Sequence, residues 1–142
     1  MVLVDTSVWI EMHRRDGRDD VKLGLQGLLD AYEATICGPV EMEFLGGARP
    51  HERERLQAWC NVLPYLRNDQ TLWRKAAVNF SLLLAKGIHM PWNDVLIATL
   101  SQEAQCRIYA CDKHFELMAP VLNLFLYNPG YLGMYVDENG TF

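Results

Sequence analysis

The sequence predicts an α/β fold from two observations about where its apolar residues fall. Short apolar runs alternate along the chain with longer stretches in which apolar residues recur at helical spacing. The first run, Val2–Val4, is apolar at every position, which is typical of a strand covered on both faces in a parallel sheet. With 142 residues, half of them hydrophobic, the chain is long enough for one domain with a substantial core.

The first part of the chain continues from this strand into helices. Ser7 is a suitable N-cap for a helix over residues 8–14, and leucine and valine recur at helical spacing over residues 21–34. The stretch ATICG, residues 34–38, has the length and composition of a second strand. Pro39 is well placed to open the helix that follows.

The middle of the chain contains two helices and a possible strand. The charged stretch ARPHERERLQAWC, residues 48–60, begins with a break at Pro50 and continues as a helix with a polar face. A third strand is predicted around residues 62–66. Residues 70–86 carry apolar side chains at helical spacing and are followed by Gly87, so they predict a long helix that ends there.

The last part of the chain alternates in the same way. A helix is predicted for MPWNDVLIATLSQEAQ, residues 90–105, and a fourth strand for RIYAC, residues 107–111. A short helix is predicted over residues 114–120, and a fifth strand over residues 123–128. From about Pro129 onward, glycine, asparagine and acidic residues are typical of a loosely held tail.

The composition limits the classes of function. The formal net charge is −5, which argues against a basic surface for nonspecific nucleic-acid binding, although an acidic cation site would add to this charge without repelling phosphate. No stretch approaches the roughly 18–20 uninterrupted apolar residues of a membrane span. No basic leader precedes the first apolar run. We therefore expect a cytoplasmic protein. The cysteines form no C-x-x-C pair and the histidines no zinc-ligand spacing, which favours buried free thiols and argues against zinc.

Four acidic residues are placed where strands end or helices begin. Asp5 and Asp112 each follow a short apolar strand, and the carboxyl ends of parallel strands share one edge of a sheet, where ligands bind. Asp94 precedes an apolar helical run and should lie in the first turn of its helix, where the macrodipole favours a negative charge. Glu43 lies one turn into the helix after the second strand. We therefore expect the four carboxylates to converge.

Converging carboxylates need a cation, because like charges a few ångströms apart push one another toward protonation. Oxygen ligands favour Mg²⁺ or Mn²⁺ over zinc. Such an ion can polarise a phosphodiester, activate a water and neutralise the leaving oxygen. Hydrolysis of a phosphate ester is therefore the chemistry that best matches these residues.

Four segments in order, VLVDTSVWIE, ICGPVEMEFLGGA, PWNDVLIATL and IYACDKHFELM, resemble a PIN-domain ribonuclease and are most similar to the toxins of VapBC-type toxin–antitoxin pairs. The resemblance implies an α/β/α sandwich with a mainly parallel sheet of about five strands, formed by a nuclease domain in residues 1–130 and followed by a C-terminal tail in residues 131–142. It also implies an endoribonuclease that needs Mg²⁺ or Mn²⁺ and acts on structured RNA. The implied partners are a second copy of the chain and a small VapB-type antitoxin whose tail fills the acidic groove.

By motif, the four acids of this family fall on Asp5, Glu43, Asp94 and Asp112, and the three aspartates are the expected metal ligands. Glu43 is preferred to Glu41 because it stands four residues before a glycine, as in the family. Residues two apart on a helix point about 200° apart, so only one of the two can face the metal. Glu41 is then expected to be exposed.

Further residues are expected to support the site or contact RNA. Thr6 and Ser7 are candidates both for capping a helix and for supporting the metal and its waters. The family usually has Thr or Ser two residues before the last acid, where this chain has Ala110, so the change either lowers activity or passes that role to Thr6 or Ser7. Trp92 is the best candidate for stacking on a base, and Lys113 for contact with substrate.

Two other functions stay open. A catalytically weak or silent PIN fold would serve as an RNA- or protein-binding module, but the loss of acids expected of it is not seen. Another magnesium-dependent phosphate-ester hydrolase, such as a haloacid-dehalogenase-like phosphatase, would need a second aspartate two residues after Asp5, where this chain has Ser7. His114 is a candidate for substrate contact rather than an obligatory base, because a water activated by a metal needs less help.

Overall fold

The computed structural model describes residues 1–141 of the chain. In chain order its elements are β1 (Val2–Val4), α1 (Thr6–His13), α2 (Asp19–Asp30), β2 (Ala34–Cys37), α3 (Gly38–Gly46), α4 (Pro50–Val62), β3 (Tyr65–Leu66), α5 (Gln70–Ala85), α6 (Trp92–Ala104), β4 (Arg107–Tyr109), α7 (Lys113–Leu122) and the 3-10 helix η1 (Tyr131–Gly133). This alternation of strands and helices confirms the predicted α/β class.

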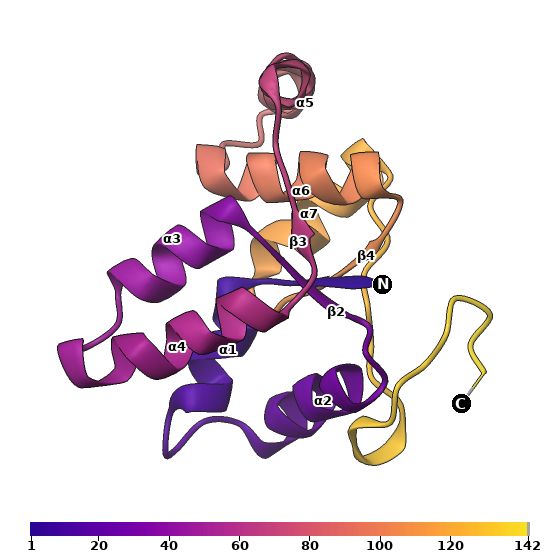
Figure 1. The fold of residues 1–142 in the computed structure, drawn as a ribbon. Coiled ribbons are helices and arrows are strands. Elements are labelled where there is room, and N and C mark those ends of the chain that lie inside the picture. The colour runs from indigo at the N-terminus through magenta and orange to yellow at the C-terminus, as the bar shows by residue number, and fades with distance from the viewer. Residues whose placement is uncertain (142) are drawn as a thin grey trace.

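The strands form one parallel sheet in the order β3-β2-β1-β4 (Figure 1). Leu3 of β1 is paired with Thr35 of β2 on one side and with Ile108 of β4 on the other. The chain thus adds β2 and β3 on one side of β1, and β4 on the other. The strand order reverses beside β1, and the carboxyl ends of β1 and β4 lie where open α/β sheets bind ligands.

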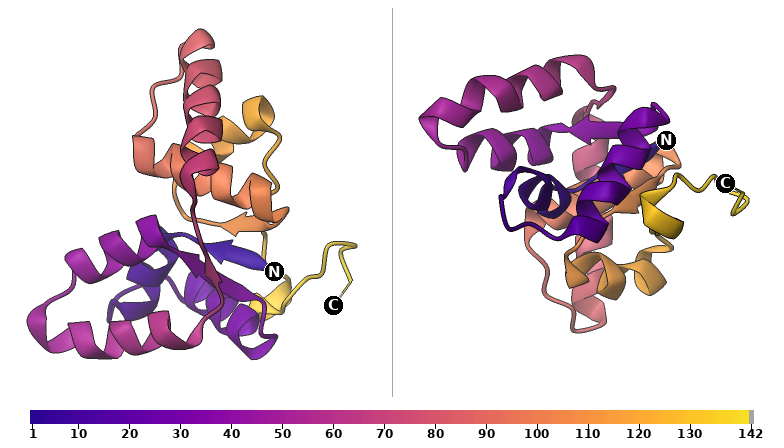
Figure 2. Two further views of the ribbon diagram at one scale, coloured as in Figure 1. Left: turned by 45° about the horizontal axis from the view of Figure 1, so that its top comes forward. Right: turned by 90° about the horizontal axis from the view of Figure 1, so that it is seen from below.

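Helices cover both faces of the sheet, which confirms the predicted α/β/α sandwich (Figures 1 and 2). On one face lie α6 and α7, with α5 packed beyond them, and on the other lie α1 and α2. The hairpin of α3 and α4 projects to one side, as the left view of Figure 2 shows. Because α3 contacts both α1 and α6, it reaches the neighbourhood of the carboxyl ends of the central strands.

The core is built around β1, whose residues Val2, Leu3 and Val4 are fully buried. The largest fully buried side chains are Trp9 of α1 and Phe115 of α7, which belong to helices on opposite faces of the sheet. All four cysteines are free thiols, as predicted, and three of them are buried. No helix in the described part of the chain has the length and apolar character needed to cross a membrane.

The main difference from the predicted fold concerns the fifth strand, expected over residues 123–128. Within residues 1–141 this segment forms a single β-bridge, between Leu126 and Ile108. Asn123 ends α7 in the left-handed conformation, with φ 54°, and the N–H of Leu124 still donates to a carbonyl of α7. The chain is therefore tied to the helix until residue 124 and pairs with β4 only briefly.

The first part of the predicted C-terminal tail is packed rather than loose. Gly133 of η1 is buried, and its carbonyl lies so close to Gly27 of α2 that a Cβ at position 27 would approach it to 2.0 Å. The guanidinium of Arg107 lies over the ring of Tyr135, 5.8 Å from its centroid. The expectation of a loosely held tail is therefore wrong for residues 131–136, and the division of the chain after residue 130 stays a prediction.

Candidate active site

Asp5 directly follows β1 and is buried, with 4% of its surface exposed. Its backbone N–H donates to the carbonyl of Tyr109 at the end of β4 (2.9 Å), so it stands where the two strands end together. Its carboxylate accepts the N–H of Ser7 at 3.0 Å and the hydroxyl of Ser7 at 2.6 Å. The N-cap of α1 is therefore Asp5 and not Ser7, and the helix begins at Thr6, two residues earlier than predicted.

Two helix starts bring Asp94, Asp112 and His114 together. Asp94 lies in the first turn of α6 with 7% of its surface exposed, and Asp112 is the N-cap of α7. The Nδ1 of His114 lies 2.6 Å from Oδ2 of Asp94 and 3.4 Å from Oδ2 of Asp112. One donor atom from each of the three residues lies within 4.8 Å of the other two. Two of the four predicted acids are thus in one cluster, together with a histidine that was not predicted as a ligand.

Asp5 and Glu43 are not part of the group of donor atoms within 4.8 Å that Asp94, Asp112 and His114 form in residues 1–141. The charges of Glu43 and Asp94 nevertheless act on the carboxyl of Asp5. Burial raises the pKa of Asp5 to about 6, against the two hydrogen bonds from Ser7, and the charges of Asp94 and Glu43 add to the increase. The folded protein therefore holds excess negative charge at the ends of its strands, which a cation would relieve.

Opposing effects also act on the pKa of Asp94. Burial raises the pKa of its carboxyl, and the hydrogen bond from His114 opposes that increase. That hydrogen bond in turn raises the pKa of the His114 imidazole, helped by the charges of the neighbouring carboxylates. When protonated, the imidazole offsets the charge of the two aspartates.

Ser7 joins the two strand ends. Its hydroxyl, which donates to Asp5, also accepts the backbone N–H of Cys111 at 2.9 Å. Cys111 follows Ala110, so Ser7 bonds the backbone next to the position at which the sequence led us to expect a hydroxyl. The hydroxyl of Thr6 is buried and has no hydrogen-bond partner within residues 1–141, which leaves it available to a water or ligand.

Glu43 of α3 is held against the start of α6. Its Oε1 accepts a hydrogen bond of 2.9 Å from the amide of Asn93, the residue before Asp94. Glu41 lies elsewhere on the helix, next to Tyr65, whose pKa is raised by burial and then by that carboxylate. The side chain of Glu43, and not that of Glu41, therefore points toward the aspartates. Glu41 is half-buried, so its predicted exposure is wrong.

A groove of about 540 Å³ opens beside Glu43, between α1 and the hairpin of α3 and α4. Three arginines, Arg14, Arg15 and Arg49, line it together with three acids, Asp16, Glu43 and Glu52, and with apolar side chains. The charge of the groove is therefore mixed, and Arg14 forms an ion pair with Asp16. The arginines can supply charge-assisted hydrogen bonds to phosphate oxygens where the groove reaches Glu43.

The two remaining predicted residues are at the surface. Trp92 is 57% exposed, and its ring centroid lies 6.4 Å from that of the equally accessible Trp73. Lys113 is exposed and forms no ion pair with any residue in 1–141. Both side chains are exposed and accessible to a partner molecule.

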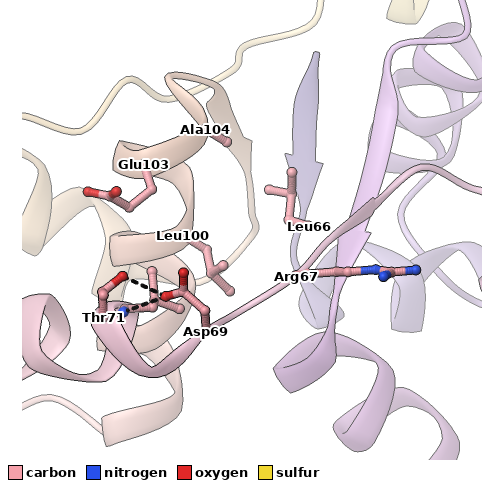
Figure 3. A pocket seen from close by; sticks show the side chains of 8 residues that line it. Leu66, Arg67, Asp69, Thr71, Leu100, Glu103 and Ala104 are labelled. Carbon is pink, nitrogen blue, oxygen red and sulfur yellow. Dashed lines mark hydrogen bonds between the residues drawn. The ribbon is translucent and has the colours of Figure 1, made fainter.

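A second pair of acids, Asp69 and Glu103, lines a smaller pocket of about 240 Å³ where the connection from β3 to α5 passes α6 (Figure 3). Asp69 caps α5 by accepting the hydroxyl of Thr71 at 2.6 Å and the N–H of Leu72 at 3.0 Å. Glu103 forms an ion pair with Lys75. Neither carboxylate belongs to a group of three possible metal ligands within residues 1–141, so this pocket is not the candidate site.

The residues at the strand ends fit a hard divalent cation. They supply carboxylate oxygens from two helix starts and one imidazole nitrogen, with the buried carboxylate of Asp5 and the unpaired hydroxyl of Thr6 beside them. Carboxylates suit Mg²⁺ and Mn²⁺, whereas a structural zinc site would be expected to use more cysteine or histidine ligands. The sequence analysis did not single out Asn93, and it expected His114 to contact substrate rather than to lie among the ligands, although each stands within two residues of a predicted acid.

Comparison with known proteins relates the sequence to one family. The family described as PIN domain matches residues 2–119. The chain is 33% identical over 129 residues to VapC ribonuclease Mb1587 of Mycobacterium bovis, an alignment that covers 87% of this chain and 96% of that protein. The same figures hold for ribonuclease VapC11 of Mycobacterium tuberculosis.

Solved structures of the same fold come from other bacteria. FitAcB from Neisseria gonorrhoeae matches with a TM-score of 0.70 and 16% identity, over 90% of this chain and 97% of that one. VapBC2 from Rickettsia felis, bound to a DNA fragment from its promoter, matches with a TM-score of 0.69 and 17% identity, over 92% of this chain and all of that one. At these identities the likeness establishes a shared fold.

Proposed function

The chain belongs to the PIN domain family, and from this membership we propose that it is an endoribonuclease that requires Mg²⁺ or Mn²⁺ and acts as the toxin of a toxin–antitoxin pair. Its similarity to VapC ribonucleases over nearly their whole length supports the reaction. The observation that carries the proposal is the grouping of Asp94 and Asp112 within 4.8 Å at the starts of two helices, where the charge of Asp94 also acts on the buried carboxylate of Asp5.

We expect Asp5, Asp94 and Asp112 to hold the cation, directly or through water. When bound, a divalent cation polarises a phosphodiester, lowers the pKa of a water and neutralises the leaving oxygen. The supporting side chains act by fixing the acids: Ser7 holds Asp5 through two hydrogen bonds, and an amide of α6 holds Glu43. Glu43 is then placed to orient the cation or the attacking water.

The surroundings of the site suit an RNA substrate. The arginine-lined groove beside Glu43 would contact the phosphate backbone, and the exposed ring of Trp92 would stack on an unpaired base. Attack in line on phosphorus would leave a 5′-phosphate and a 3′-hydroxyl. An RNA with an accessible single-stranded segment is the substrate class that these contacts favour.

The proposed partners are a cognate VapB-type antitoxin and a second copy of the chain. Several solved structures of the same fold are of toxin–antitoxin complexes, among them one from Klebsiella pneumoniae and a DNA-bound VapBC from Salmonella typhimurium. An acidic site next to a groove would bind a basic side chain of an antitoxin tail. Binding in this way would block the metal site and the path of the RNA together.

The test is cleavage of total RNA by the purified protein, with new 5′ ends mapped. We expect discrete cuts with Mg²⁺ or Mn²⁺, none in EDTA, and a loss of at least about 100-fold in Asp94→Asn and Asp112→Asn. Asp30→Asn, an exposed acid at the end of α2, is the matched control and should cleave like wild type. Equal cleavage by the site variants and wild type would refute the proposal, and wild-type binding of RNA without cleavage would favour the silent binding module.

A further inference from the structure

We propose that His114 is a nitrogen ligand of the divalent cation and that it makes the site prefer Mn²⁺ to Mg²⁺. This inference rests on the proposed function, because it concerns the same metal site. The four acids of the family pattern do not include this residue, and its side chain is what the structure adds to the two aspartates at the helix starts.

The spacing of the donor atoms carries the inference. In an octahedral site with bonds of about 2.1 Å, neighbouring donors lie about 3 Å apart. The Nδ1 of His114 lies 2.6 Å from Oδ2 of Asp94 and 3.4 Å from Oδ2 of Asp112, values on either side of this length. The imidazole nitrogen is thus spaced from each carboxylate oxygen like a neighbouring donor on one octahedral ion, and all three residues offer donor atoms within 4.8 Å of one another.

The backbone fixes the imidazole in this place. Asp112 caps α7 by accepting the backbone N–H of His114 at 2.9 Å, so the same helix start orients both side chains. The side chains of His114 and Asp112 are 39% and 36% exposed and that of Asp94 is 9% exposed, so solvent reaches the cluster on the side of His114 and Asp112. The Nδ1 atom faces the carboxylates of both Asp94 and Asp112, so the neutral imidazole would present its nitrogen to a cation that these acids hold.

The choice of metal follows from the ligand atoms. Mg²⁺ keeps oxygen ligands and releases its waters reluctantly, so it gains little from a nitrogen donor. Transition-metal ions accept imidazole readily, and Mn²⁺ also accepts carboxylates, so a site with two carboxylates and one imidazole favours Mn²⁺. Removal of the nitrogen should therefore weaken Mn²⁺ binding while leaving Mg²⁺ binding nearly unchanged.

The test measures the bound ion rather than activity. Pulsed EPR of one equivalent of Mn²⁺ on the full-length protein detects the ¹⁴N coupling of a directly bound imidazole. Calorimetric titrations with Mn²⁺ and with Mg²⁺ give the two affinities. His114→Asn is the informative variant, because its amide can still donate to Asp94 from nearly the position of Nδ1 but offers no nitrogen ligand. His89→Gln, at an exposed histidine, is the matched control.

We expect ¹⁴N coupling in wild type and in His89→Gln, and its loss in His114→Asn together with an about tenfold or larger fall in Mn²⁺ affinity. Mg²⁺ affinity should change by less than about threefold. Tightly bound Mn²⁺ without ¹⁴N coupling in wild type would overturn the role of His114 and leave the proposed function standing. Mn²⁺ binding that is absent, or that persists unchanged in Asp94→Asn, would contradict the metal site itself and both proposals with it.

Discussion

Replacing Asp5 by asparagine should stabilise the metal-free protein while removing its metal-dependent activity. Burial raises the pKa of Asp5 from 3.8 to about 6, so the ionised carboxylate costs the folded state about 3 kcal/mol relative to the unfolded chain. Asparagine has the same shape without the charge. It is as good an N-cap as aspartate and can still accept the hydrogen bonds of Ser7.

The sign of the pH dependence follows from the direction of the shift. Between about pH 4 and pH 6 the folded state holds the Asp5 proton and the unfolded state has lost it, so wild-type stability falls as the pH rises through this window. Below pH 4 both states are protonated, and above pH 6 the loss is complete. The advantage of Asp5→Asn should therefore be near zero at pH 4 and about 3 kcal/mol at pH 8.

Urea unfolding in EDTA at the two pH values measures this difference. Asp5→Ala is the matched control, because it also removes the charge but loses the helix cap, and it should be about 1 kcal/mol less stable than Asp5→Asn at both pH values. Saturating Mg²⁺ should stabilise wild type and not Asp5→Asn. A variant that is no more stable than wild type at pH 8, or a gap that does not depend on pH, would refute the reasoning.

Three further substitutions test the packing around the site and the tail. Ser7→Ala removes a hydroxyl bonded to Asp5 and to a backbone N–H, and should lower the free energy of unfolding in urea by about 2 kcal/mol; an unchanged value would show that this hydroxyl does not tie the strand ends together. Asn79→Ala breaks the buried amide contacts between α5 and α6 and should cost about 1–3 kcal/mol in the same titration, whereas a neutral result would contradict a satisfied buried network. Gly27→Ala places a methyl group against the carbonyl of Gly133 and should expose the C-terminal segment to faster chymotryptic cleavage; a wild-type cleavage rate would contradict the packing of η1 on α2.

Local sequence patterns predicted the elements that position the site. The apolar run Val2–Val4 became the fully buried central strand, as predicted, although the first helix is capped by Asp5 and not by the predicted Ser7. Asp94 was expected in the first turn of its helix, because an apolar run follows it, and that is where it lies. Strand ends and helix starts are set by neighbouring residues, so these placements could be inferred from the sequence.

Side-chain contacts between distant segments could not be inferred in this way. His114 follows Asp112 by two residues, but its turn toward Asp94 depends on how α7 crosses the start of α6. The packed tail likewise depends on long-range contacts, such as that of Arg107 with Tyr135. Neither contact leaves a periodic signal in the sequence, because each depends on tertiary packing rather than on local preference.

The most direct test of the account is the position of Mn²⁺ in crystals of the protein, located by anomalous scattering. The account predicts one dominant peak within bonding distance of Asp94 and Asp112, with Asp5 reaching the ion directly or through one water. A saturated crystal with no ion at these carboxylates, or with its ion elsewhere on the molecule, would contradict it.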